Sequence, residues 1–464
     1  MDVTARLAEF SAGLRYEDLP ARVRLQARML LLDAVGVMLG GVALHEANGD
    51  QHLQRFLHDM APEGDGTIVG YRRQTSAAMC AFANGVLAQV LDFQDTTVTG
   101  KIHTGAAVIP AALAMAERQG VRGEDLITAL VAGYEVANRV AVAMQPAHWF
   151  AGFQATGTIG TIGAAAAAAS ILKLTAPETA VALGMAGTIL PLSNGDSSFK
   201  GYTAKTVQAG AAASRGIEAA FMARAGFTAG PLEGEPPRHH AFMYLMGDGK
   251  PDLTKALVAI GSEWHILRAA FKPYPVGIVI VGPVEMCLDL LSQRKIAPDE
   301  IASVTVTTYR EAYHFTGKIY TTPQSSEIEC FLSTPFCMAV SLIDGEMTLR
   351  QRVDSRLRDA KTHELASRVV VHEDAEMTRR YPDEWRTRLE LRLRDGQTIT
   401  REISQVKWSP QRPATWDQLE EKFHSLAQPV IGSKAVEAVE MLCRLDELND
   451  VRALSNVLRP VPRD

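Results

Sequence analysis

The sequence has few aromatic residues and no excess of basic charge. Phe, Trp and Tyr make up only 6% of its 464 residues, and alanine and glycine supply much of the remaining apolar volume. This composition favours closely packed helices over a β-sandwich. The formal net charge of −6 argues against a nucleic-acid-binding protein, because such proteins bind through a basic surface.

Several motifs with well-defined chemistry are also missing. The sequence contains no P-loop, no G-x-S-x-G and no H-E-x-x-H. Its five cysteines form neither a C-x-x-C pair nor a disulfide framework, and we expect neither a metal site nor an oxidising compartment. Residues 1–20 lack the apolar segment of a secretory signal. These absences predict a cytoplasmic protein.

One uncharged run, at residues 151–172, is long enough to cross a membrane. Gly, Ala and Thr supply most of it, and Leu and Ile contribute little. The run includes GTIGTIG, whose glycines are spaced by three, follow no strand and lead into polyalanine. We therefore predict a buried helix packed through its small residues, without a membrane span or a dinucleotide site.

The chain divides by pattern into a helical part and a mixed part. At 464 residues it is long enough for two domains. Residues 1–266 show helical periodicity, with helices expected within 21–41, 123–144 and 209–227 and no strong strand signal. Residues 267–404 contain strand patterns at 301–309 and 367–374, a helix at 334–347 and a hairpin at 387–403 that turns at Asp395-Gly396.

Residues 405–464 return to helices, which we expect to pack on the first helical part. The prediction is thus a mainly α protein with an α+β part. A large all-helical domain is built from both chain ends, 1–266 and 405–464, and a smaller α+β domain spans 267–404.

A polar segment, LDFQDTTVTGKIHTG at 91–105, lies between two uncharged apolar segments. Asp92 and Asp95 would share one side of a helix, and burial of either carboxylate would raise its pKa unless it had a partner. His103 precedes an apolar helix, where it would stay neutral and could act as a base or a donor. The alternatives are that Asp95 and the neighbouring threonines cap a helix and that His103 is structural.

A second polar segment, SFKGYTAKTVQAG at 198–210, precedes another apolar helix. Its side chains include Lys200, Tyr202, Lys205 and Gln208. Lysines near a helix start are unfavourable for the helix dipole unless an anion lies between them and the helix amides. An anion site and a solvated loop both remain open from this pattern.

Five stretches, taken in their order along the chain, resemble the MmgE/PrpD family. They are FANGVLAQVLDFQDTTVTGKIHTGAAVIPAALA, GFQATGTIGTIGAAAAAASILKL, AKTVQAGAAASRGIEAAFMARAGFT, KPYPVG and TPFCMAVSLIDGEM. The family includes 2-methylcitrate dehydratase, cis-aconitate decarboxylase and iminodisuccinate epimerase. The resemblance implies a site between the two domains that needs no cofactor, a small di- or tricarboxylate as substrate, and a homodimer.

The resemblance also implies site residues. The family's D-F-D-D-T motif and the histidine after it fall on Asp92, Thr96 and His103. A family lysine falls on Lys205, and a family tyrosine falls near Tyr320. Departures from the family include Gln94 for Asp, HTG for H-P, and Gln154 where the family has a histidine; GIVIVG at 277–282 lacks the usual Cys and His.

From these residues we predict an acid/base role for His103, oriented by Asp92. The assignment of Asp92 as the base, with His103 as a hydrogen-bond donor, is equally open. Lys205 and Tyr320 complete the expected catalytic group. The expected substrate-binding residues are Thr96, Lys101, Gln154, Gln208 and Lys272.

Three functions fit this site. The first is a dehydratase or decarboxylase, a lyase that transfers a proton at the carbon next to a carboxylate. The second is an epimerase or isomerase that uses the same proton abstraction. The third is a family member that binds a ligand without catalysis.

Overall fold

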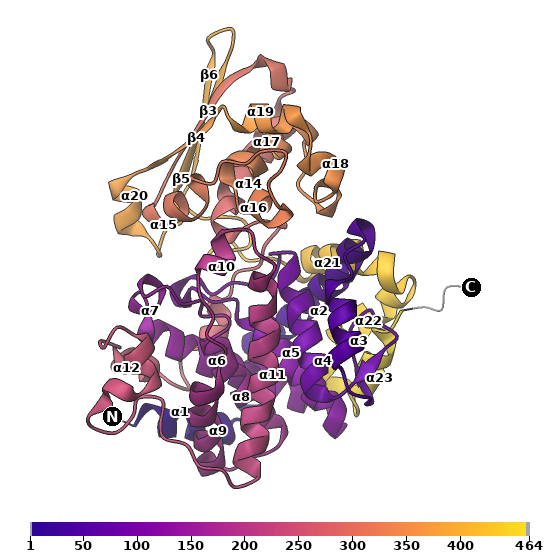
Figure 1. The fold of residues 1–464 in the computed structure, drawn as a ribbon, viewed down its shortest axis with the longest axis vertical. Coiled ribbons are helices and arrows are strands. Elements are labelled where there is room, and N and C mark those ends of the chain that lie inside the picture. Colours follow the sequence, from indigo (N-terminus) through magenta and orange to yellow (C-terminus); the bar gives the residue numbers. More distant parts are fainter. Residues whose placement is uncertain (1, 461–464) are drawn as a thin grey trace.

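The computed structural model describes residues 2–460, and it confirms a mainly helical fold with an α+β part (Figure 1). The helices of the first part are α1 (Val3–Gly13), α2 (Ala21–Asn48), α3 (His52–Met60), α4 (Ala77–Val90), α5 (Thr104–Gln119), α6 (Gly123–Met144), α7 (Ala147–Phe150), α8 (Ile159–Ile171), α9 (Ala176–Ile189), α10 (Asp196–Phe199), α11 (Ala204–Arg224), α12 (Phe242–Met246) and α13 (Leu253–Leu257). A two-stranded pair, β1 (Gly66–Thr67) and β2 (Gln74–Thr75), was not predicted, because two residues per strand give no alternation to recognise.

Helix α2 ends later than predicted. The sequence suggested an end near Gly40-Gly41, but the helix continues to Asn48 and stops at Gly49, which is left-handed with φ 64°. A Cβ on Gly41 would lie only 2.8 Å from the carbonyl oxygen of Leu87 in α4. The glycines inside α2 therefore allow a close helix crossing and do not terminate the helix.

The uncharged run at 151–172 forms a turn followed by the buried helix α8, as predicted. A Cβ on Gly163 would lie 2.7 Å from the Cβ of Ala137 in α6. Close packing of α8 on α6 accounts for this glycine. Helices α2 and α6 are long and apolar enough to cross a membrane by length and composition, but most of each apolar window is buried inside the fold, as in the core helices of soluble proteins.

The α+β part contains a four-stranded sheet in the order β4-β3-β5-β6. Its elements are β3 (Ile301–Thr308), β4 (Val369–Glu373), β5 (Thr387–Leu393), β6 (Thr398–Ile403), α14 (Val281–Gln293), α15 (Arg310–Ala312), α16 (Glu327–Phe331), α17 (Thr334–Asp344), α18 (Asp354–Leu357), α19 (Ala360–Ala366) and α20 (Ala375–Arg380). Strand β3 pairs parallel with β4 and antiparallel with β5. The predicted strands and the 387–403 hairpin are confirmed, with Gly396 at φ 93° in the turn.

Three helices close the chain: α21 (Trp416–Ile431), α22 (Lys434–Cys443) and α23 (Arg452–Val457). They are drawn in yellow beside the indigo helix α2 in Figure 1, and a Cβ on Gly36 of α2 would lie 3.1 Å from Phe423 Cδ2 in α21. The two chain ends thus share one hydrophobic core.

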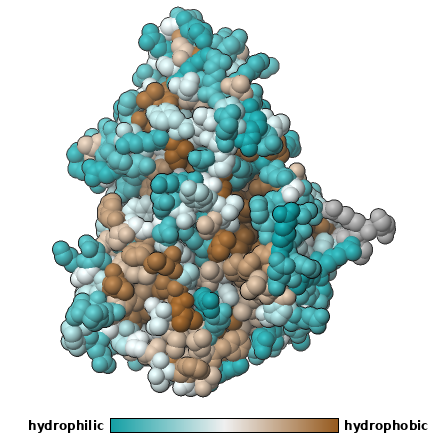
Figure 2. Space-filling model, in the orientation of Figure 1, coloured by the Kyte–Doolittle hydropathy of each residue, from teal (hydrophilic) through white to brown (hydrophobic). Residues whose placement is uncertain are grey.

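Apolar residues gather mainly over the helical part on the face shown in Figure 2, and the α+β part above it is more hydrophilic.

Candidate active site

A cavity of about 130 Å³ lies where the helical part meets the α+β part. The helical part contributes the polar segment after α4, residues near α7, and the start of α11. The α+β part contributes Ile278 and Val279, residues in and after α15, Leu332 and Tyr381. Since one water needs roughly 10–15 Å³ of such space, the cavity has room for on the order of ten non-hydrogen atoms. This is the size of a small carboxylic acid.

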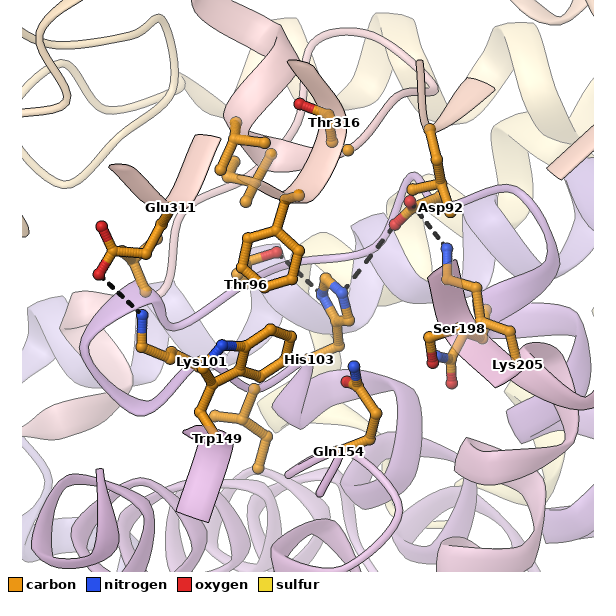
Figure 3. A pocket seen from close by; sticks show the side chains of 18 of the residues that line it. Asp92, Thr96, Lys101, His103, Trp149, Gln154, Ser198, Lys205, Glu311 and Thr316 are labelled. Carbon is orange, nitrogen blue, oxygen red and sulfur yellow. Dashed lines mark hydrogen bonds and ion pairs between the residues drawn. The ribbon is translucent and has the colours of Figure 1, made fainter. Parts of the chain in front are cut away.

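Asp92 lines the cavity beside Lys205 (Figure 3), and Lys272 contacts the same carboxylate. Lys205 Nζ donates to Asp92 Oδ2 at 2.9 Å, and Lys272 Nζ donates to Oδ1 and to the backbone oxygen, both at 2.7 Å. Burial alone would raise the pKa of Asp92, but Lys205 and Lys272 outweigh burial and hold that pKa well below its usual value. The carboxylate is ionised, and this three-residue cluster carries one net positive charge.

The backbone supports this geometry at some energetic cost. Asp92 is left-handed with φ 49°, a conformation that costs on the order of 1–3 kcal/mol for a residue other than glycine. The two bonds from Lys272, whose side chain is 0% exposed, hold the residue in place. Burial lowers the pKa of Lys272 to about 8, against the opposing effect of Asp92.

His103 is the N-cap residue of α5 and faces the same cavity. Its Nδ1 lies 3.0 Å from the backbone oxygen of Asp95 and 2.9 Å from Thr96 Oγ1. A carbonyl oxygen can only accept a hydrogen bond, so Nδ1 carries the proton and Nε2 is a free base in the neutral ring. Nε2 lies 4.0 Å from Asp92 Oδ1.

The electrostatic surroundings keep His103 neutral. Burial, followed by the charge of Lys272, lowers its pKa to about 3, although Asp92 acts in the opposite direction. The prediction that this histidine precedes a helix is confirmed, and the lowered pKa agrees with the predicted neutral ring. Its Nε2 is suited to accept a proton from a bound molecule, or to return one.

Asp95 does not join this group, contrary to the predicted shared helix side. Residues 91–97, which follow α4, are not helical, and the Asp95 carboxylate accepts a hydrogen bond from Tyr134 at 3.1 Å. Burial, with the charge of Asp33, raises its pKa to about 7. A Cβ on Gly105 would lie 2.2 Å from Asp95 Oδ1, so HTG supplies the glycine that this contact requires.

Two residues distant in sequence support the polar segment from behind. Lys422 of α21 donates to the backbone oxygens of Phe93 and Lys272 at 2.9 and 3.1 Å and pairs with Asp33 at 2.7 Å. Arg352 of the α+β part bonds the backbone oxygen of Leu91, the residue before Asp92. Both chain ends and both parts therefore position Asp92.

Opposite the lysine cluster, Lys101 pairs with Glu311 at 3.5 Å. Lys101 Nζ also lies 5.3 Å from the ring centre of Tyr381. Trp149 and Phe315 lie beside this pair, with ring centres 4.3 Å apart. In Figure 3 the Lys101–Glu311 pair and the Asp92–Lys205 pair stand on opposite sides of His103.

The structure brings together most of the predicted residues. Asp92, Thr96, Lys101, His103, Gln154 and Lys205 line the cavity, and Lys272 contacts it through Asp92. Helix α11 begins at Ala204, so Lys205 and Gln208 lie inside the helix instead of before it. The anion opposite Lys205 is the protein's own Asp92.

Two predicted residues lie elsewhere. Gln208 is buried, but its amide donates to the backbone oxygen of Asn194 at 3.0 Å, and it does not line the cavity. Tyr320 is 64% exposed and does not line it either. Tyr381, which follows a different strand, does line it.

Sequence reasoning missed cavity-lining residues from both parts and the supporting ions. These are Trp149, Ser198, Glu311, Phe315, Thr316, Tyr381, Arg352, Lys422 and Asp33. Only Asp33, an isolated charge in the apolar run LLLDAVG, could have been recognised from the sequence as a buried ion that needs a partner. Within residues 2–460, no group of three or more His, Cys, Asp and Glu side chains is placed to hold a metal ion.

Comparisons with known proteins match this chain along its length. The MmgE/PrpD N-terminal domain matches residues 5–251, and the MmgE/PrpD C-terminal domain matches residues 274–446. A cis-aconitate decarboxylase of Aspergillus terreus is 25% identical over 98% of this chain and 96% of its own. The cis-aconitate decarboxylase-like protein oryM of Aspergillus oryzae is 27% identical over 95% and 93%.

The cis-aconitate decarboxylase of Homo sapiens is 24% identical over 98% of this chain and 94% of its own. Both family domains are present in order, and together they include every cavity-lining residue. The chain belongs to the MmgE/PrpD family.

Proposed function

We propose that this protein is a lyase that decarboxylates a small carboxylic acid in the cavity between its two parts. The relatives named cis-aconitate decarboxylase, matched over almost their whole length, support a lyase of this family. The observation that carries the proposal is the free Nε2 of His103 beside a cluster with one net positive charge.

The cluster would bind a substrate carboxylate. Lys205 lines the cavity and has donors beyond the one bonded to Asp92, and the Thr96 hydroxyl adds another. A positive charge in a buried site also stabilises the negative charge that develops when a carbon–carboxylate bond breaks. The breaking bond leaves its electron pair on the adjacent unsaturated carbons, and carbon dioxide departs.

His103 would complete the reaction by delivering a proton to carbon. An anionic substrate favours the protonated imidazole beside it, so binding brings in one proton from solvent. The imidazolium gives this proton from Nε2 to the carbanion and returns to the neutral form. Atoms balance, because one carboxylate and one proton become one carbon–hydrogen bond and carbon dioxide.

A second function is favoured by one observation. In the unliganded site Nε2 is already unprotonated, which suits abstraction of a proton next to a carboxylate. An epimerase or isomerase needs only that step and the return of the proton.

The test is an NMR experiment in deuterium oxide with cis-aconitate and other small di- and tricarboxylates, combined with measurement of released carbon dioxide. We expect one solvent deuteron in the product for each carbon dioxide. His103→Ala should lower kcat by about 10²- to 10⁴-fold, the usual contribution of acid/base catalysis. The matched control is His52→Ala, because the His52 side chain is 77% exposed in α3, away from the cavity.

Deuterium exchange without release of carbon dioxide would contradict the decarboxylase proposal and support an epimerase or isomerase. If folded wild-type protein gave neither exchange nor carbon dioxide with every compound, the proposal of a carbon-acid reaction would be wrong.

A further inference from the structure

The cavity is strongly asymmetric in polarity. Asp92 and Lys205 line one side, with Lys272 behind Asp92, and Trp149 lies on the other side beside Lys101, against Phe315 (Figure 3). Ile278 and Val279 add further apolar lining. The rings of Trp149 and Phe315 are inclined at 51°, so that together they form a broad apolar wall. A substrate that spans the cavity meets a cationic surface at one end and a hydrocarbon surface at the other.

The charged residues at the apolar end do not change this contrast. Lys101 and Glu311 are 13% and 21% exposed and pair with each other, and their charges sum to zero. A carboxylate placed there would lose its hydration and would lie near the Glu311 carboxylate. The cation at that end, Lys101, is already neutralised by Glu311 and would not offset this cost. The one excess positive charge lies at the end with Lys205, where Lys272 behind Asp92 supplies it.

The backbone fixes this arrangement. Lys101 is left-handed with φ 50°, and Thr97 and Ile102 exchange backbone hydrogen bonds across it at 2.9 and 3.3 Å. The tight turn directs Lys101 across to Glu311, away from Lys205 (Figure 3). Lys101 and Lys205 therefore cannot bind two distant carboxylates of one substrate unless the Lys101–Glu311 ion pair breaks.

We propose that the preferred substrate carries at most two carboxylates, both at the Lys205 end, and an alkyl or aryl arm that packs on Trp149, Phe315, Ile278 and Val279. This inference rests on the proposed function, because it assumes that a carboxylate binds beside Lys205. It assigns Glu311 and the apolar wall as determinants of specificity against tricarboxylates.

The test uses two compounds with the same core. Cis-aconitate is maleate with a carboxymethyl arm, and benzylmaleate replaces that arm with an apolar ring. Isothermal titration calorimetry should show that wild-type protein binds benzylmaleate about 10- to 100-fold more tightly, which is the effect of burying one large apolar group. Carbon dioxide release should follow the same order in kcat/KM.

Two variants should weaken the preference for benzylmaleate. Glu311→Gln removes the negative charge that neutralises Lys101, and Ile278→Lys adds a cation to the apolar wall. Each variant should bind cis-aconitate more tightly, so that the ratio of the dissociation constants of the two compounds falls by tenfold or more. The matched control is Glu376→Gln on the exposed surface of α20, which should leave both affinities unchanged. Circular dichroism checks that each variant is folded.

The outcomes separate the two proposals. If wild-type protein binds or converts cis-aconitate as well as benzylmaleate or better, the inference about the apolar arm is wrong and the lyase proposal stands. An unchanged preference in both folded variants would also overturn the inference. If neither compound binds, and maleate itself does not, both proposals fail together.

Discussion

The three-residue charge cluster predicts strong coupling between Asp92 and Lys205. Asp92→Asn leaves Lys272, 0% exposed, and Lys205, 10% exposed, as neighbouring cations without a carboxylate. Loss of one partner from a buried ion pair costs about 3–5 kcal/mol of unfolding free energy. Asparagine tolerates the left-handed backbone at position 92, so the change acts on charge and not on conformation.

Replacing Lys205 should cost less unfolding free energy than replacing Asp92. Lys205→Met removes one charged hydrogen bond, worth about 1.5–3 kcal/mol, but Asp92 keeps Lys272 at 2.7 Å. In the double variant one lysine faces a neutral amide oxygen, and no two cations are left together. We expect its loss to be smaller than the sum of the single losses by about 1–3 kcal/mol.

Urea unfolding of the four proteins, followed by circular dichroism at neutral pH, measures this coupling. The control cycle is Asp196→Asn with Lys200→Met, an ion pair whose side chains are 65% and 64% exposed. We expect no measurable coupling there, since solvent screens the pair. Additive losses at Asp92 and Lys205, within about 0.5 kcal/mol, would refute the charge cluster as described.

Further predictions concern pH dependence and support of the site. Because His103 is neutral above a pKa of about 3 and the proposed decarboxylation takes up one proton there, kcat/KM should fall about tenfold per pH unit near pH 6.5, and more steeply above about pH 8, where Lys272 loses its proton. A pH-rate profile that is level at about pH 6.5 would favour the isomerase, which uses the neutral ring. Gln154→His places a titrating ring in the cavity, and the same profile should then gain a transition between about pH 5 and 8. Arg352→Met leaves the Leu91 carbonyl and the partly buried Glu327 without their partner, and urea unfolding should show a loss of about 3–5 kcal/mol.

Most of the fold could be predicted because its signals are local. The alternating pattern of 301–309 and the Asp395-Gly396 turn indicate β3 and the hairpin from a few neighbouring residues each. Helix ends were less predictable. Gly41 could mean a stop or a close crossing, and only the position of α4 decides between them.

The candidate site was predictable where its residues lie in one segment. Asp92, Thr96 and His103 are within twelve residues, and polarity between apolar segments marked them. The opposite wall could not be located, because Glu311 and Tyr381 are 70 residues apart and follow different strands. Tyr320 was assigned from the family pattern, and the register of an irregular loop is not fixed by any periodicity.

The electrostatics of the site link binding to folding. Two lysines and one aspartate are buried together with one charge in excess, and Asp92 is held in a left-handed conformation by its contacts with Lys272. A bound carboxylate would bring this cluster to neutrality, so the unliganded protein bears an electrostatic cost that the ligand removes. The Asp33–Lys422 pair behind it is already neutral and needs no ligand. The unbalanced cluster is therefore the place where we propose that an anion binds, and the balanced pair supports the fold.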